Sequence, residues 1–405
     1  MANRITSSAY VLSGGACVKV AVAGTVLRAA YLLAGDVELS ANHDHLCGML
    51  RLWIEEGVGI GSDLVANLSE NALHSSLVAA SFVLQGLTTA VLAMGSGSSG
   101  IRGTNDMVAA ALYWANPLVV STGAASVVHS AMHLCIAGTA VAADVLREAG
   151  LFAAVPVVCG PLFLGLCYLQ PCFVALLPAV CVCCLSPASV NTSPSSSSSS
   201  PHRTWTWVCS LAACAAAVAF VYFSCPSPYV TTVTPTAAFS LFVPSTGVVV
   251  DYPLSLTWYL SRQVFPQDWD YMVHLLGSVP LAATPAVALH FRATPAKALL
   301  LSLALALLFC SSAMPGDQAL ILALWARLSS VKGDGGGSPA GRVAGATGTD
   351  MIPYIAVGAS LALLAPVMVH QWVARGTVNA NFVFFVATVQ WALWGGVFLS
   401  YASAQ

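Results

Sequence analysis

The stretch that decides the class of fold is VVHSAMHLCIAGTAVAADVL, residues 127–146. It contains one acidic residue and no lysine or arginine. An α-helix needs roughly 20 residues to cross a bilayer, so this stretch is long enough. Comparable apolar runs recur along the whole chain. They cover residues 10–34, 76–94, 107–125, 127–146, 150–168, 170–185, 206–225, 270–290, 297–313, 317–329, 351–370 and 381–402. The pattern predicts an all-α, polytopic transmembrane bundle of about twelve spans, forming one domain over residues 1–405.

The composition supports this prediction. Hydrophobic residues make up 58% of the chain and charged residues only 7%, and the mean hydropathy is +0.81. Soluble domains carry roughly 25% charged residues, so a water-facing surface cannot be built from so few. The formal net charge of -2 excludes a strongly basic nucleic-acid binder.

The 13 cysteines do not predict a disulfide framework, because most of them lie inside apolar runs. There we expect them to pack as small apolar side chains. The cysteines in such runs include Cys159, Cys167, Cys172, Cys181, Cys183, Cys184, Cys209 and Cys214.

The polar stretches predict the topology. Residues 186–205 contain a serine run and residues 331–350 are rich in glycine, which is typical of flexible linkers. Lysine and arginine concentrate on one side of the bundle if the chain starts in the cytoplasm and crosses about twelve times. We therefore expect both termini and these two linkers in the cytoplasm. Residues 35–75 then form the first luminal loop, residues 226–268 form the second, and residues 314–316 and 371–380 are luminal turns.

The first luminal loop holds two short patterns that carry possible chemistry. Asp36 and Glu38 have the acid-x-acid spacing that a metal-assisted glycosyltransferase uses. His43 and His45 flank Asp44 and could offer two imidazoles to a metal. A solvated loop explains both patterns as well, since polar clusters are common there.

The other luminal segments contain aromatic, acidic and amide side chains. Asp251 precedes Trp258 and Tyr259, which are typical interfacial anchors. Asp317 opens an apolar run, where it can cap a helix. Asn379 and Asn381 stand at the start of the last run, where they can cap the helix or offer amides to a phosphate or sugar.

Two histidines lie inside the run quoted first. His129 and His133 are four residues apart, so they share one face of a helix. We expect them to form hydrogen bonds between helices. A proton path would need a longer chain of polar groups than this sequence contains.

Several of these motifs together resemble the PIG-U family, the multispanning subunit of the GPI transamidase complex. Near the C-terminus the sequence reproduces a W-x(3)-G-x(2)-N-x-N-F pattern with Trp372, Gly376, Asn379, Asn381 and Phe382. Pro315-Gly316-Asp317 is similar to a Y-P-T-V-G-D element of the family, in a shortened form.

Other elements are similar to the family or depart from it. Asp251, Pro253, Trp258 and Tyr259 resemble its luminal D-x-x-P and F-W-Y residues. Asn116-Pro117 matches an N-P at a helix end, and Glu70 is similar to the glutamate of an H-E-T-P-L segment. Met132-His133 replaces a pair of asparagines.

The resemblance implies a non-catalytic subunit in the endoplasmic-reticulum membrane, with a fold like the lipid-linked-sugar glycosyltransferase C fold. It implies no metal, no cofactor and no catalytic residue in this chain, and a cysteine-protease-like catalytic subunit among its partners. The GPI glycolipid and membrane lipid would be its ligands. The residues implied to hold them are Asn379, Asn381, Phe382, Trp372, Arg375, Asp317, Asp251, Trp258 and Tyr259.

One alternative belongs to a different class of function. A dolichol-phosphate-dependent mannosyltransferase of the same pathway would need a catalytic carboxylate after the first apolar run, and Asp36 or Glu38 could supply it.

Overall fold

A computed structural model shows how these segments fold. It describes residues 22–26, 28–29, 70–94, 101–116, 118–120, 127–149, 151, 154–169, 171–185, 269–292, 294–310, 313–329, 360–361, 364, 367–368, 371, 375–377 and 380–403. The segment 206–225, the serine-rich and glycine-rich linkers and nearly all of the predicted first luminal loop lie outside this part of the chain.

Every regular element in the described residues is a helix, as the sequence predicts. The α-helices and the single 3-10 helix η1 are α4 (Glu70–Ala93), α5 (Ile101–Trp114), α7 (Val127–Glu148), α8 (Ala154–Leu169), η1 (Pro171–Leu176), α9 (Leu177–Leu185), α12 (Trp269–His290), α13 (Pro295–Phe309), α14 (Pro315–Ser329) and α17 (Ala380–Ser403). Residues 22–26 and 28–29 are also helical.

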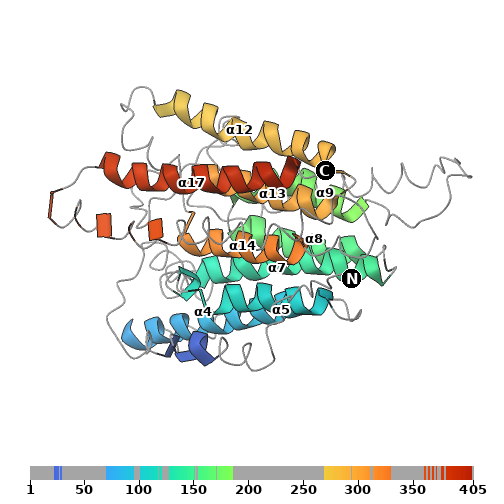
Figure 1. Ribbon diagram of the computed structural model, residues 1–405, viewed down its shortest axis with the longest axis horizontal. Helices are drawn as coiled ribbons and strands as arrows, with labels where there is room; N and C mark the ends of the chain where they lie inside the picture. Colours follow the sequence, from blue (N-terminus) through green and yellow to red (C-terminus); the bar gives the residue numbers. More distant parts are fainter. Residues whose placement is uncertain are drawn as a thin grey trace, which may run out of the picture.

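The helices lie side by side with their axes roughly parallel (Figure 1). In that view α7, α13 and α14 occupy the middle, with α4 and α5 on one side and α12 and α17 on the other. Helix α7 packs along both α4 and α8, and α14 packs along α5. The helix that carries the two histidines is therefore a central one.

The core is a continuous apolar cluster that runs from α4 and α5 through α7, α8 and η1 to α13 and α14. Leucine, valine and alanine supply most of it, and several cysteines are part of it. Small residues allow close approach of the helices. A Cβ atom on Gly138 of α7 would lie 3.0 Å from the Leu162 side chain of α8.

Where the structure describes whole predicted segments, they agree with the helices except at two places. The run 107–125 is not one helix, because α5 ends at Trp114. Asn116 follows, and its side chain accepts a hydrogen bond from the backbone N–H of Leu118 (3.0 Å), the first residue of the short helical segment 118–120. A proline at position 117 lacks the N–H that would continue the helix.

The run 170–185 is also divided. Helix α8 ends before Pro171, six residues of 3-10 helix follow, and α9 has only nine residues. The backbone carbonyl of Ala175 in η1 accepts a hydrogen bond from the Thr284 hydroxyl of α12 (2.6 Å). A neighbouring helix thus satisfies one of the backbone carbonyls in this irregular segment.

By length and composition, one helix in the described residues is long and apolar enough to cross a membrane alone, over Val127–Arg147. The remaining apolar helices in that part of the chain are shorter by the same measure. The prediction of about twelve spans is not confirmed. Large apolar side chains are exposed on α4, α5, α8, α12 and α17, among them Val83, Met107, Val157, Leu289 and Phe385.

Two buried arginines connect helices that are distant in sequence. The Arg28 guanidinium donates to the Gln85 side-chain oxygen (2.8 and 3.1 Å) and to the Trp114 carbonyl (2.6 Å), and it lies 3.6 Å from the Trp114 ring centroid. Arg327 of α14 donates to the Leu92 carbonyl (2.9 Å) and pairs with Asp106 (3.4 Å). The first fixes the helix around residue 28 against α4 and α5, and the second fixes the end of α14 against them.

The Arg28 contact requires a glycine one turn earlier. A Cβ atom on Gly24 would lie 2.4 Å from the Trp114 side chain and 2.9 Å from its backbone oxygen. We predict that Gly24→Ala lowers the free energy of unfolding by about 1–3 kcal/mol, because the indole and backbone must move apart. The measurement is the thermal unfolding midpoint of the detergent-solubilised protein.

Gly160→Ala is the matched control, since a Cβ atom there meets nothing within 4 Å. Equal midpoints for the two variants would contradict the close approach of the residue 22–29 helix to Trp114.

Candidate functional site

A chain of buried polar side chains crosses three helices of the core. The Tyr113 hydroxyl of α5 lies 2.8 Å from Nδ1 of His133 on α7. Nε2 of His133 lies 2.7 Å from Oδ1 of Asp317 on α14. All three side chains are nearly inaccessible, with Tyr113 at 0%, His133 at 1% and Asp317 at 2% exposure. An ionised carboxylate only accepts hydrogen bonds, so Nε2 of His133 donates to Asp317.

The second oxygen of the Asp317 carboxylate caps its own helix. Oδ2 accepts a hydrogen bond from the Met314 backbone N–H (2.7 Å), and the Asp317 N–H bonds back to the Met314 carbonyl (3.1 Å). The carboxylate also stands in the first turn of α14, where a negative charge is favoured. Both carboxylate oxygens therefore accept hydrogen bonds from groups of the protein. These bonds hold the turn at Pro315 in place.

A second polar cluster surrounds Gln85 on α4. Its side-chain amide donates to the Val119 carbonyl (2.6 Å) while its oxygen accepts from Arg28. Ser81 and Ser130 share a hydrogen bond of 2.6 Å between α4 and α7. These groups fix α4 against α7 and against the helical segment 118–120.

Within the C-terminal motif, the described residues 375–377 form a turn that precedes α17. Thr377 bonds to Gln371 three times: the backbone N–H donates to the Gln371 carbonyl (3.2 Å), and the hydroxyl lies 3.2 Å from the same oxygen and 3.0 Å from the side-chain oxygen. Gly376 has φ +61°, a conformation that side chains with a Cβ rarely adopt. This explains the glycine of the motif.

The predicted binding residues near this turn are exposed where the structure describes them. Arg375 is exposed in the turn, and Asn381 and Phe382 are exposed in the first turn of α17. Phe382 is 57% exposed, and Phe385, one turn further, is 65% exposed. A cation in the turn and an amide and two phenyl rings in the first two turns of α17 are thus exposed.

The other predicted residues lie outside the described part of the chain. They are Trp372, Asn379, Asp251, Trp258 and Tyr259, together with Asp36, Glu38, His43 and His45. Among the described residues, no group of three or more His, Cys, Asp or Glu side chains is arranged to hold a metal ion.

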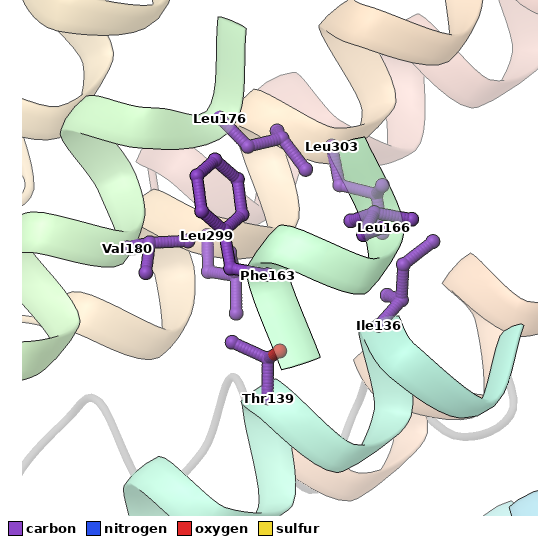
Figure 2. Close-up of a pocket in the computed structure, with 8 residues that line it drawn as sticks. All are labelled: Ile136, Thr139, Phe163, Leu166, Leu176, Val180, Leu299 and Leu303. Atoms are coloured by element: carbon purple, nitrogen blue, oxygen red, sulfur yellow. The ribbon is translucent and has the colours of Figure 1, made fainter. Parts of the chain in front are cut away.

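The interior also contains a small apolar pocket between α7, α8, α9 and α13, drawn in Figure 2. It leaves room for about one water molecule. Its single polar side chain, Thr139, donates its hydroxyl to the Cys135 carbonyl of its own helix (2.8 Å). This pocket is a gap in the core packing, too small for a glycolipid. The residues that line it are Ile136, Thr139, Phe163, Leu166, Leu176, Val180, Leu299 and Leu303.

Comparison with known families identifies the chain. The family described as GPI transamidase subunit PIG-U matches residues 68–391, which is well over half of the 405 residues. The chain belongs to the PIG-U family. A search of curated proteins finds no match. The resemblance expected from the motifs is therefore confirmed, and the PIG-U match includes the P-G-D turn, the whole Tyr113–His133–Asp317 chain and the C-terminal motif.

Sequence reasoning found the histidines of this PIG-U chain but not their partners. The expected hydrogen bond between helices is confirmed for His133, which bonds to Asp317 of α14. Tyr113, Arg28 and Gln85 were missed. Each is a polar side chain inside an apolar run, and that is the signal that could have found them.

The His133–Asp317 hydrogen bond provides a test of this network. We predict that His133→Ala and Asp317→Ala each lower the free energy of unfolding by about 1–3 kcal/mol, because each leaves a buried polar partner unsatisfied. The double variant should lose clearly less than the sum of the two. A double-mutant cycle on thermal or denaturant unfolding in detergent measures the coupling.

His290→Ala provides the control, since His290 is exposed at the end of α12. Strictly additive losses for His133→Ala and Asp317→Ala would show that the two side chains do not interact.

Proposed function

We propose that the chain is a non-catalytic, multi-pass subunit of a GPI transamidase in the endoplasmic-reticulum membrane. The family match over residues 68–391 carries this proposal. A chain with 58% hydrophobic and 7% charged residues is suited to a bilayer. In this proposal the chain crosses about twelve times, both termini face the cytoplasm, and the fold is like the glycosyltransferase C fold.

The chemistry belongs to a partner in this proposal. A cysteine-protease-like subunit cuts the C-terminal signal of a precursor protein and passes the new carboxyl end to the amine of the GPI ethanolamine. This chain holds the GPI lipid and the other subunits around that reaction. The polar side chains of its core support a structural role, because Tyr113, His133 and Asp317 bond to one another in a buried chain.

The N-terminal end of α17 is the proposed site for the GPI head group. Asn381 is exposed in the first turn of a 24-residue helix, where the backbone dipole favours a phosphate. Asn379 comes two residues earlier and would add a second amide. Arg375, exposed in the preceding turn, can pair with a phosphate through charge-assisted hydrogen bonds. The three side chains match a ligand rich in phosphate and hydroxyl groups.

The same end of the helix offers apolar contacts. Phe382 and Phe385 are more than half exposed and lie one turn apart on α17. Acyl or glycerol carbons can pack on these rings, and Trp372, Trp258 and Tyr259 would complete an aromatic rim by stacking on sugar. Asp251 would belong to this rim. In this proposal Asp317 acts indirectly, by holding the first turn of α14 with a carboxylate that is already paired within the protein.

The family match favours this function over the mannosyltransferase alternative. The family is named for a transamidase subunit, and Asp36 and Glu38 precede the matched residues.

The amide pair provides the first functional test. We predict that Asn379→Ala/Asn381→Ala lowers the surface display of GPI-anchored proteins several-fold in cells that depend on this chain, because two donors to the head group are lost. Flow cytometry of a GPI-anchored reporter measures the effect, with protein abundance checked by immunoblot.

Thr388→Ala is the matched control, since it removes an exposed polar group two turns further along α17. Asp36→Ala/Glu38→Ala should leave display intact. Normal display after the paired asparagine changes would rule out the proposed head-group site.

Purification in a mild detergent tests the assembly. We predict that the tagged chain isolates with a cysteine-protease-like subunit and further membrane partners. The readout is mass spectrometry of the eluate against a tagged, unrelated multi-pass protein. A chain that purifies alone and transfers mannose from a lipid-linked donor would refute the proposal.

A further inference from the structure

Two thiols that are far apart in sequence meet inside the bundle. The Sγ atoms of Cys172 in η1 and Cys310 at the end of α13 are 3.2 Å apart, across 138 residues of chain. Each residue is only 1% exposed. A disulfide joins sulfurs about 2.05 Å apart, so the two atoms need to approach by only about 1 Å.

The backbone at both positions can absorb such a movement. Cys310 is the C-cap of α13 and has left the helical conformation, with φ -70° and ψ 126°. Cys172 lies in a 3-10 helix, whose hydrogen bonds are poorer than those of an α-helix. Neither cysteine is held in the middle of an α-helix, where a shift would disturb the whole turn.

Two other buried thiols in the described helices have a different kind of partner. Cys159 donates to the Thr139 carbonyl (3.5 Å) and Cys183 to the Pro295 carbonyl (3.4 Å). In both cases a backbone oxygen is the partner, which fits the packing role expected for cysteines in apolar helices. Of these three contacts, Cys172–Cys310 is the one between two sulfur atoms.

The predicted topology places this pair toward the lumen. In that topology residues 314–316 form a luminal turn. The run 170–185 crosses from the lumen to the cytoplasm, so its first residues also lie near the lumen. The lumen of the endoplasmic reticulum favours disulfides. This step rests on the proposed function, since the family match is what suggests that membrane.

We propose that Cys172 and Cys310 form a disulfide in the mature protein. The oxidant is a disulfide of the lumen, carried by glutathione disulfide or by a dithiol oxidoreductase in its oxidised form. One cysteine thiolate attacks that disulfide and forms a mixed disulfide, and the displaced thiolate takes up a proton. The second cysteine thiolate then attacks the mixed disulfide. The two thiols lose two electrons and two protons, and the oxidant leaves as two thiols.

The bond would act on the turn that carries Asp317. Cys310 ends α13, and the chain reaches Met314 four residues later, where the backbone N–H bonds to the Asp317 carboxylate. Fixing Cys310 to η1 therefore fixes one side of that turn. The bond would also close a long loop, which restricts the unfolded chain.

Blocking and counting the thiols tests the inference. Cells are lysed with N-ethylmaleimide under denaturing conditions, and the full-length chain is then reduced and labelled with a maleimide-polyethylene glycol. Cys172→Ser and Cys310→Ser should each gain two fewer adducts than the wild type, and Cys159→Ser should match the wild type. Mass spectrometry of the unreduced wild type should find the Cys172 and Cys310 peptides linked.

N-ethylmaleimide on both Cys172 and Cys310 of the wild type before reduction would overturn the inference, and this result does not depend on whether the serine variants fold. The proposed function is tested separately, by co-purification of the transamidase partners. Linked peptides without partners would reject only the function, and partners with two free thiols would reject only the disulfide.

Discussion

A carboxylate enclosed by apolar helices must be paired, since burying an unpaired charge costs far more than burying carbon. Asp317 meets this requirement by accepting from His133 on one oxygen and from the Met314 backbone on the other. His133 uses its second nitrogen on Tyr113. Three helices are thereby fixed at one relative height, because a shift by a single turn would break both hydrogen bonds. The position of the start of α14 depends on this contact.

The two buried arginines must also be paired. Their contacts lie in one half of the bundle, and the other half is held together differently. Arg28 and Arg327 bind carbonyl, amide and carboxylate groups of α4 and α5, so this half is held by directional polar contacts. The half formed by α8, α9 and α13 is held mainly by apolar packing and small residues. The proposed head-group site belongs to neither of these two halves. It stands on α17, where phenylalanines are exposed and the chain before the helix makes a glycine turn.

Much of the fold could be predicted because apolar runs and their interruptions are local properties. Helix α7 matches the run 127–146 to within two residues at either end, since nothing inside that run favours a turn. The runs 107–125 and 170–185 were predicted as single segments and are divided at Asn116-Pro117 and after Pro171. Both runs contain a proline in the sequence. Whether a helix resumes after the proline depends on whether a neighbouring side chain can bond to the backbone carbonyls left without a helical partner. For η1, that neighbour is Thr284.

The sequence by itself determined the helical class, the family and the W-x(3)-G-x(2)-N-x-N-F motif near the C-terminus, because these follow from composition, periodicity and residues close together in the chain. The tertiary structure alone decided which polar groups meet. Asp317 could be read as a helix cap from its position, but its bond to His133 spans 184 residues. The contact between Cys172 and Cys310 spans 138. Such contacts exist only after apolar packing has set the height and rotation of each helix, so no local pattern in the sequence encodes them.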